Sequence, residues 1–425
     1  MTDEKQARVT AGQVLRSRKM WIPAAVILSL FSFFLSLTYM GAIVNPQQAM
    51  RELPVGLVNA DTGAGQIDFG QQLTAGIAGA STDGKVAWKQ LTEQQARDEM
   101  AKGKLYGALV VPENFTASVL ALGGPAQPGA QRPTVTVLTN PAAGSLASSM
   151  ATSVAQQAAH SASTQLGARL TAQTAAHQPA TTGAQQFLLA DPIAVRTDVG
   201  HALSGNSGLG MTAFFYMLLL VMCGFIGANV LHGLVDSGLG FGPSDFGPWR
   251  SHRPTAPIDR RHTLFTAWGL LAGLAVPMAA LVMLACVTVL GMDAGHLPLL
   301  FTFSYCAIVV VGISCLSVLA TFGTPGILVT TFVFIALAIP SSGGTIPLET
   351  VPGFYRAISS FEPMRQLTDG VRAILYFDAA GDAGLNRAWT MMGFGLLLAL
   401  ALGYGATTLY ERKGLHRHLK AEIAS

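Results

Sequence analysis

Long uncharged apolar runs constrain this chain more than any other sequence feature. A helix that crosses a bilayer has about 20 predominantly apolar residues, and six runs approach that composition. These runs cover residues 20–44, 209–231, 263–290, 297–320, 327–339 and 388–410. Because hydrocarbon tolerates backbone only when its hydrogen bonds are closed within the segment, each run should be a helix. The sequence therefore predicts an α-helical integral membrane protein with six transmembrane helices.

The first run, residues 20–44, follows Arg16, Arg18 and Lys19. A basic start before an apolar run is also typical of a cleaved signal peptide, which is the alternative. This run is longer than the apolar region of a signal peptide, and no clear Ala-x-Ala site ends it. We therefore expect an uncleaved transmembrane helix, preceded by a cytoplasmic amphipathic N-terminus at residues 1–19.

Basic residues cluster in three places that share one side of the membrane when there are six spans. They lie before the first span, between the second and third spans (250–261), and in a basic tail (411–425). Cytoplasmic segments carry the excess of Lys and Arg, so both termini should be cytoplasmic, in a bacterial inner (plasma) membrane. The five-helix membrane domain (209–410) then has an outer re-entrant region at 340–386.

Residues 45–208, between the first and second spans, have the composition of a soluble protein. Strand-like and helix-like segments alternate there, which predicts an inserted extracytoplasmic α/β domain with a mixed sheet. The expected strands cover 53–58, 85–89, 105–111 and 135–138, and the expected helices cover 69–77 and 92–101. Thr92 is the expected N-cap of the second helix. Alanine-rich residues 145–176 favour a further helix, with a disordered linker as the alternative.

No motif in the chain indicates catalysis. The histidines lack metal-ligand spacing, and the four cysteines fall in apolar segments without the spacing of a disulfide framework or a zinc site. The net charge of +3 gives no reason to expect nucleic acid. We therefore expect no enzyme activity, no metal and no cofactor. Between residues 263 and 345 the only charged residue is Asp293, which disfavours coupling to a proton gradient.

The predicted outer region supplies a first set of candidate residues. Pro340-Ser-Ser-Gly-Gly-Thr-Ile-Pro347 cannot form a continuous helix, because proline and paired glycines break it. Beyond it, Phe354 and Phe361 share one helical face before Pro363 interrupts. We expect two short interfacial helices that cap an outer mouth, and the alternative is that they only fill an outer surface.

Two arginines in the same region are candidates for ligand contact. Arg365 and Arg372 have the chemistry to hold a lipid phosphate, which makes membrane lipid an expected partner. Ion pairing with Glu362 or Asp369 is the favoured alternative.

Basic and aromatic residues on the predicted cytoplasmic side are candidates for docking a partner. They are Arg16, Arg18, Trp249, Arg250, Arg260 and Arg261. The ordinary excess of positive charge on the cytoplasmic side explains the same arginines equally well.

Three segments, taken in order and spacing, resemble a known family. They are LPVGLVNAD (53–61), GKLYGALVVPENF (103–115), and VPGFYRAISSFEPM (351–364) followed by DGVR (369–372). They resemble type-2 ABC export permeases, and in particular the YhgE/phage-infection-protein branch. The resemblance implies a permease subunit that forms a homodimer or heterodimer, recruits a separate cytoplasmic ATPase, and exports a hydrophobic or lipid-like compound.

The chain departs from that family in one segment. The loop after the second span lacks the Glu-Arg/Lys-x-x-Gly segment on which the ATPase docks in such permeases, and reads LVDSGLGFG (234–242) instead. The alternative is therefore a non-transporting membrane scaffold or surface receptor of the phage-infection-protein type.

Overall fold

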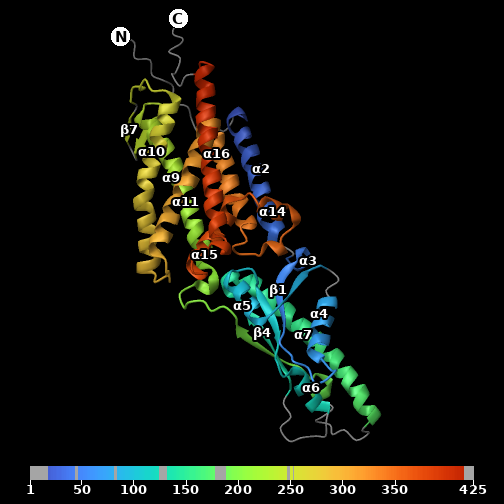
Figure 1. The fold of residues 1–425 in the computed structure, drawn as a ribbon. Helices are drawn as coiled ribbons and strands as arrows, with labels where there is room; N and C mark the ends of the chain where they lie inside the picture. Colours follow the sequence, from blue (N-terminus) through green and yellow to red (C-terminus); the bar gives the residue numbers. More distant parts are fainter. Residues whose placement is uncertain are drawn as a thin grey trace, which may run out of the picture.

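The computed structural model describes residues 18–43, 46–80, 84–123, 132–177, 188–246, 249–251 and 253–415. Figure 1 shows a bundle of long helices with a smaller part, built around a β-sheet, at one end of it. A short β-hairpin lies at the opposite end of the bundle, where the label β7 stands.

Four helices in the described part of the chain are long and apolar enough to cross a membrane. They are α9 (Thr212–Gly238), α10 (Arg260–Met283, continued by a π-helical stretch, Leu284–Val289), α11 (Leu297–Phe322) and α16 (Leu385–Arg412). Each covers all or most of one of the six predicted runs. α9 begins three residues later than expected and ends seven residues later, at Gly238.

The other two predicted runs form shorter apolar helices. One is Ala25–Gly41 within α2 (Arg18–Ile43). The other is Pro325–Ser341. It consists of α12 (Pro325–Thr331), a π-helical stretch (Phe332–Ala336) and α13 (Ala338–Ser341). This helix begins at Pro325, two residues before the predicted run at 327–339.

The bundle has a packed interior and an apolar exterior. Leu220 on α9, Leu271 on α10 and Phe303 on α11 are fully buried, whereas Leu281 on α10 is 64% exposed and Leu397 on α16 is 69% exposed. α11 packs against α9, α10 and α16 and so lies at the centre. Water would penalise so much exposed apolar surface on neighbouring helices, whereas lipid tails would not.

The sheet has five strands in the order β2-β1-β3-β4-β5. They are β1 (Leu53–Asn59), β2 (Val86–Leu91), β3 (Gly107–Val111), β4 (Thr134–Thr139) and β5 (Ala194–Val199). β1 runs parallel to β2 and β3, β4 is antiparallel to β3, and β5 is parallel to β4, so the sheet is mixed as expected.

Helices cover both faces of the sheet. Along β3, Ala108 and Val110 contribute to the cluster beneath α5 (Glu93–Ala101), while Leu109 and Val111 contribute to the cluster beneath the other helices. This alternation is the period of two that a strand imposes on its side chains. The other face is covered by α4 (Phe69–Ala80), α6 (Phe115–Gly123) and α7 (Ser145–His177).

Local signals explain most of these boundaries. Thr92 caps α5 as predicted: its hydroxyl accepts from the Gln95 amide, and the Gln95 side chain accepts from the Thr92 amide, a reciprocal capping box. The alanine-rich segment forms the helix α7 and is not a linker. The sequence reasoning missed α6, β5 and the hairpin of β6 (Ser244–Phe246) and β7 (Trp249–Ser251).

Residues between α13 and α16 form short helices and turns. α13 ends at Ser341, so the segment up to Pro347 is not helical, as its prolines and glycines predict. A single 3-10 turn (Leu348–Thr350) leads to α14 (Gly353–Ile358) and α15 (Pro363–Tyr376), the two short helices expected there. A further 3-10 turn (Gly381–Ala383) precedes α16. The short helix α3 (Pro46–Ala49) joins α2 to the sheet.

Candidate functional site

A groove lies between α7 and the sheet, and the sequence of α7 builds one of its walls. Residues four apart lie on one face of a helix. One such face carries Ala151, Ala155 and Ala159, which are at most 1% exposed. These small side chains let α7 lie close to β3 and β4. The helix is thus fixed on the sheet by one face, and a neighbouring face is left to line a cavity.

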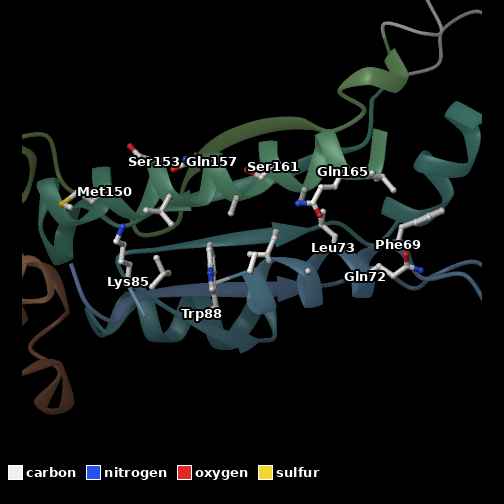
Figure 2. A pocket seen from close by; sticks show the side chains of 18 of the residues that line it. Phe69, Gln72, Leu73, Lys85, Trp88, Met150, Ser153, Gln157, Ser161 and Gln165 are labelled. Atoms are coloured by element: carbon white, nitrogen blue, oxygen red, sulfur yellow. The ribbon is translucent and has the colours of Figure 1, made fainter. Parts of the chain in front are cut away.

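That neighbouring face carries a polar stripe beside an apolar one, since the groove is also lined by Met150, Val154, Ala158, Ala162 and Leu166 of α7. At intervals of four residues it presents Ser149, Ser153, Gln157, Ser161 and Gln165 to the groove. The opposite side is apolar and comes from Leu73 and Ile77 of α4 and from Val86 and Trp88 of β2. Figure 2 shows Lys85 and Trp88 pointing from the sheet toward α7, with Leu73 in the space beneath the helix.

The groove has a volume of about 800 Å³, within the range of about 300–1,000 Å³ found for small-molecule sites. Of the described residues that line it, Lys85 and Arg169 are cationic and none is a carboxylate. A mostly apolar lining with a stripe of hydroxyl and amide groups along α7 suits a molecule with an apolar body and polar substituents. The charges favour a neutral or anionic compound over a cation.

One end of the groove lies beside the outer re-entrant region. Met50 lines the groove, and the next residue, Arg51, donates its backbone amide to the Glu349 carbonyl oxygen at 2.7 Å. α3 also packs against the turn Leu348–Thr350. The groove therefore begins close to the segment that was expected to cap the bundle.

The aromatic candidates of that segment are exposed. Phe354 on α14 is 63% exposed and Phe361, between the two short helices, is 80% exposed. Pro363 is the first residue of α15, where a proline is tolerated because the first helical amides have no intrahelical partner. Glu362 caps the same helix, since its carboxylate accepts from the amides of Met364 (2.9 Å) and Arg365 (2.8 Å).

Glu362 is also an unusual carboxyl group. It is only 4% exposed. Burial raises its pKa to about 8, against the two backbone hydrogen bonds and the nearby Arg365, which act to lower it. Glu349 behaves similarly: burial raises its pKa, although the Tyr106 hydroxyl donates to Oε2 at 3.1 Å. No local sequence pattern predicts this Tyr106–Glu349 contact, because the two residues are 243 positions apart.

The two arginine candidates converge on one carboxylate. Arg365 Nε and Arg372 Nη1 each lie 3.8 Å from an oxygen of Asp369, so the pairing favoured from the sequence is present for Asp369. Arg372 also donates from Nη2 to the carbonyl oxygens of Gly343 (3.2 Å) and Gly344 (3.0 Å). It thereby satisfies the irregular backbone that follows α13.

The docking candidates lie in two different environments. Trp249 is 75% exposed on the hairpin, and Arg250 follows it. In contrast, Arg261 donates from both its amide and Nε to the Glu411 carboxylate, and Arg260 donates from Nε to the Leu415 carbonyl oxygen at 2.8 Å. Both residues thus join the start of α10 to the end of α16.

The N-terminal candidates are described only in part. Arg18 is the first residue of α2, and Arg16 lies outside the described residues. Among the residues that are described, no group of three or more His, Cys, Asp or Glu side chains has the arrangement to hold a metal ion.

Together, the four long apolar helices and the small mixed sheet are consistent with a multi-helix membrane protein. The chain belongs to the family described as "Protein of unknown function (DUF3533)", which matches residues 24–395. It is similar to the "Uncharacterized protein YhgE" of Bacillus subtilis (strain 168), with 24% identity over 232 residues. That match covers 53% of this chain and 26% of the relative, so the chain spans about a quarter of the relative's length. No solved structure matches the chain.

Proposed function

We propose that this chain is the permease subunit of an exporter of the type-2 ABC kind. It moves a hydrophobic or lipid-like compound, uses a separate cytoplasmic ATPase, and works as a dimer without enzyme activity of its own. The observation that carries this proposal is the groove between α7 and the sheet, which combines apolar side chains with a stripe of hydroxyl and amide groups and begins at Met50, next to the re-entrant segment. A compound that leaves the bundle there meets a surface that matches its two kinds of chemistry.

The proposal includes a topology. α2 and the Pro325–Ser341 helix cross the membrane together with the four long helices, which gives six spans in a bacterial inner membrane. The sheet then lies outside the cytoplasm, and the hairpin β6–β7 lies in it. Figure 1 supports this division, because the sheet and the hairpin lie at opposite ends of the bundle.

Cysteine labelling tests the topology. Lys102→Cys, near the sheet, should react with a membrane-impermeant maleimide added to intact cells or spheroplasts. Trp249→Cys, on the hairpin, should react only after permeabilisation. Lys102 has a 43% exposed side chain and Trp249 is 75% exposed, so both sites are open to reagent. The reverse pattern would invert the topology and exclude export through the groove.

Blocking the groove tests its role in transport. Ala158→Trp places a large ring among the groove residues, whereas Ala168→Trp places the same ring on an exposed position of α7 outside them. We expect Ala158→Trp to reduce export of a hydrophobic test compound from cells, and Ala168→Trp to leave it unchanged. Equal export by both variants would remove the groove from the path.

Co-purification tests whether an ATPase associates with this chain. The tagged chain, extracted from native membranes in mild detergent, should bring down an ATPase with nucleotide hydrolysis. Trp249→Ala should reduce its recovery, and Arg196→Gln, on β5, should not. If neither an ATPase nor hydrolysis accompanies the wild-type chain, the permease proposal fails.

A membrane scaffold or surface receptor is the second candidate, and one observation favours it. Arg260 and Arg261, two of the predicted docking residues, make contacts within the bundle. This leaves Trp249 and Arg250 as the predicted docking residues on the hairpin. In this case the groove binds an extracytoplasmic partner, and blocking it abolishes that binding without any effect on export.

A further inference from the structure

A second cavity, of about 380 Å³, lies where the sheet meets the helical bundle. Its walls come from the turn between α5 and β3, from the irregular segment after α13, and from α15. It is separate from the groove described above, because the two share no lining residue.

Cationic side chains predominate in this junction cavity. The five cations are Lys89, Lys102, Lys104, Arg365 and Arg372, and the three carboxylates are Glu349, Asp369 and Asp382. Asp382 is shared by two of the lysines, since its Oδ2 lies 3.2 Å from Lys102 Nζ and 3.3 Å from Lys104 Nζ. Lys89 is paired with Glu99, outside the lining, at 3.2 Å. The other four cations face three carboxylates, so the lining keeps an excess of one positive charge.

Arg372 is the buried cation of the cavity. It is 7% exposed, and its Nε has no hydrogen-bond partner among the described residues. Its Nη1 is 3.8 Å from Asp369 Oδ1, which is longer than the roughly 2.7–3.2 Å of an N–H···O hydrogen bond. A buried guanidinium that leaves a donor unused is costly unless a ligand accepts from it.

Asp369 does not supply that acceptor. It is shared between Arg365 Nε and Arg372 Nη1, both at 3.8 Å, and Arg365 Nη1 donates to the Ser359 hydroxyl at 2.9 Å. The two guanidinium groups and the lysines at the mouth, 40–43% exposed for Lys102 and Lys104, thus share three carboxylates, and none of these carboxylates accepts a hydrogen bond from Arg372 Nε.

We propose that the junction cavity is an anion site that binds a phosphate group through Arg372, with Lys102 and Lys104 at its entrance. A phosphate has several acceptor oxygens and so satisfies a guanidinium and an ammonium at once. A bound phosphate would link the sheet to α15, because its ligands come from both. This inference is independent of transport and holds for a permease and for a receptor alike.

Binding to the purified full-length chain tests the site. Inorganic phosphate is titrated into protein in a non-ionic, phosphate-free detergent, and binding is followed by calorimetry and by the thermal midpoint. In parallel, the protein is placed in nanodiscs of a phosphate-free glycolipid, with and without phosphatidylglycerol. Saturable binding of inorganic phosphate identifies a soluble phosphate as the source. A response to phosphatidylglycerol alone identifies a lipid headgroup.

Three variants test whether phosphate binding is specific to this cavity or comes from non-specific attraction to positive charge. Arg372→Lys keeps the charge and removes the Nε donor, and we expect it to weaken phosphate binding about tenfold, the loss typical of one charge-assisted hydrogen bond. Lys104→Gln, at the exposed entrance, should weaken binding several-fold without affecting the fold. Arg196→Gln, on β5 away from the cavity, should bind as the wild type does. No saturable response to either phosphate source, or unchanged binding in both Arg372→Lys and Lys104→Gln, overturns the proposal.

Discussion

Gly224 on α9 lies directly against the backbone of Ile308 on α11. A Cβ built at Gly224 would stand 2.8 Å from the Ile308 carbonyl oxygen and 2.9 Å from Val311 Cβ. Backbone atoms have little freedom to move aside, so the absence of a side chain at this position sets how closely the two helices pack. α9 and α11 together form the centre of the bundle.

We predict that Gly224→Ala destabilises the bundle. Forcing a methyl group into a packed interface typically costs about 1–3 kcal/mol, which should lower the thermal midpoint of the detergent-solubilised protein. Gly233→Ala on the same helix is the matched control, since a Cβ there meets nothing within 4 Å. If both variants unfold at the wild-type temperature, the α9–α11 contact is looser than described.

The buried Glu362 carboxyl predicts that stability falls as pH rises. Its pKa is raised to about 8, whereas an unfolded glutamate titrates near about 4.3. Between these values the native state binds more protons than the unfolded state, so stability decreases with rising pH across this window. Glu362→Gln retains a hydrogen-bond acceptor and cannot ionise, so its thermal midpoint should fall less between pH 5 and pH 8.

The exposed Glu113, replaced by glutamine, is the control for Glu362 and should keep the wild-type pH dependence. If the wild type and Glu362→Gln have the same slope, Glu362 does not carry a buried proton in the native state.

Asp61 predicts the opposite pH dependence, in which stability falls as the pH falls. Its carboxylate accepts from the amides of Gly70 and Thr116, both at 3.0 Å, and from the Thr116 hydroxyl. Burial acts to raise its pKa, but these hydrogen bonds outweigh burial and lower it. A lowered pKa means that Asp61 stabilises the fold above its unfolded pKa of about 3.9 and loses this contribution as the pH falls through the native value.

We therefore expect Asp61→Ala to lower the thermal midpoint at pH 7, by the loss of hydrogen bonds worth about 1 kcal/mol each. The difference from the wild type should shrink as the pH is lowered toward 3. Asp98→Ala, on the surface of α5, should have little effect at either pH. A constant difference between Asp61→Ala and the wild type at all pH values would contradict the assignment.

The contact between Arg261 and Glu411 predicts that Glu411 stabilises the fold, whereas Trp249 serves in docking a partner. Glu411→Gln removes the charge that holds the start of α10 to the end of α16, so its thermal midpoint should be lower than that of the wild type. Trp249→Ala, at an exposed position, should leave the midpoint unchanged and weaken recovery of a cytoplasmic partner. If Trp249→Ala unfolds the protein while Glu411→Gln does not, the roles of the two positions are reversed.

Most elements of the sheet follow from local sequence signals. Thr92 and Gln95 predict the start of α5, and the alanines of residues 145–176 predict α7. β5 was missed because its residues, Ala194-Val-Arg-Thr-Asp-Val199, are mostly exposed and carry no strong alternation. Its place at the sheet edge depends on pairing with β4, a contact across about 60 positions of sequence.

The candidate sites are less visible in the sequence. The serine and glutamine stripe of α7 has a regular spacing of four residues, but from the sequence we predicted only a helix there and no groove. The sequence does not indicate the opposite wall of the groove either, because Trp88 and Leu73 are equally typical of ordinary core residues. In the junction cavity, Arg365 and Arg372 were candidates, whereas Glu349 and Lys104 come from segments far apart in the chain.

The sequence by itself determined which segments are helices able to lie in hydrocarbon, because charge and apolar run length are local properties. It also determined four of the five strands of the small mixed sheet, since alternation and capping are local as well. Only the tertiary structure decided that Arg261 binds Glu411, and that Arg372 turns its buried guanidinium toward Gly343 and Gly344. Those contacts depend on which helices pack side by side, and long-range packing is set by the sum of many weak contacts that no short segment encodes.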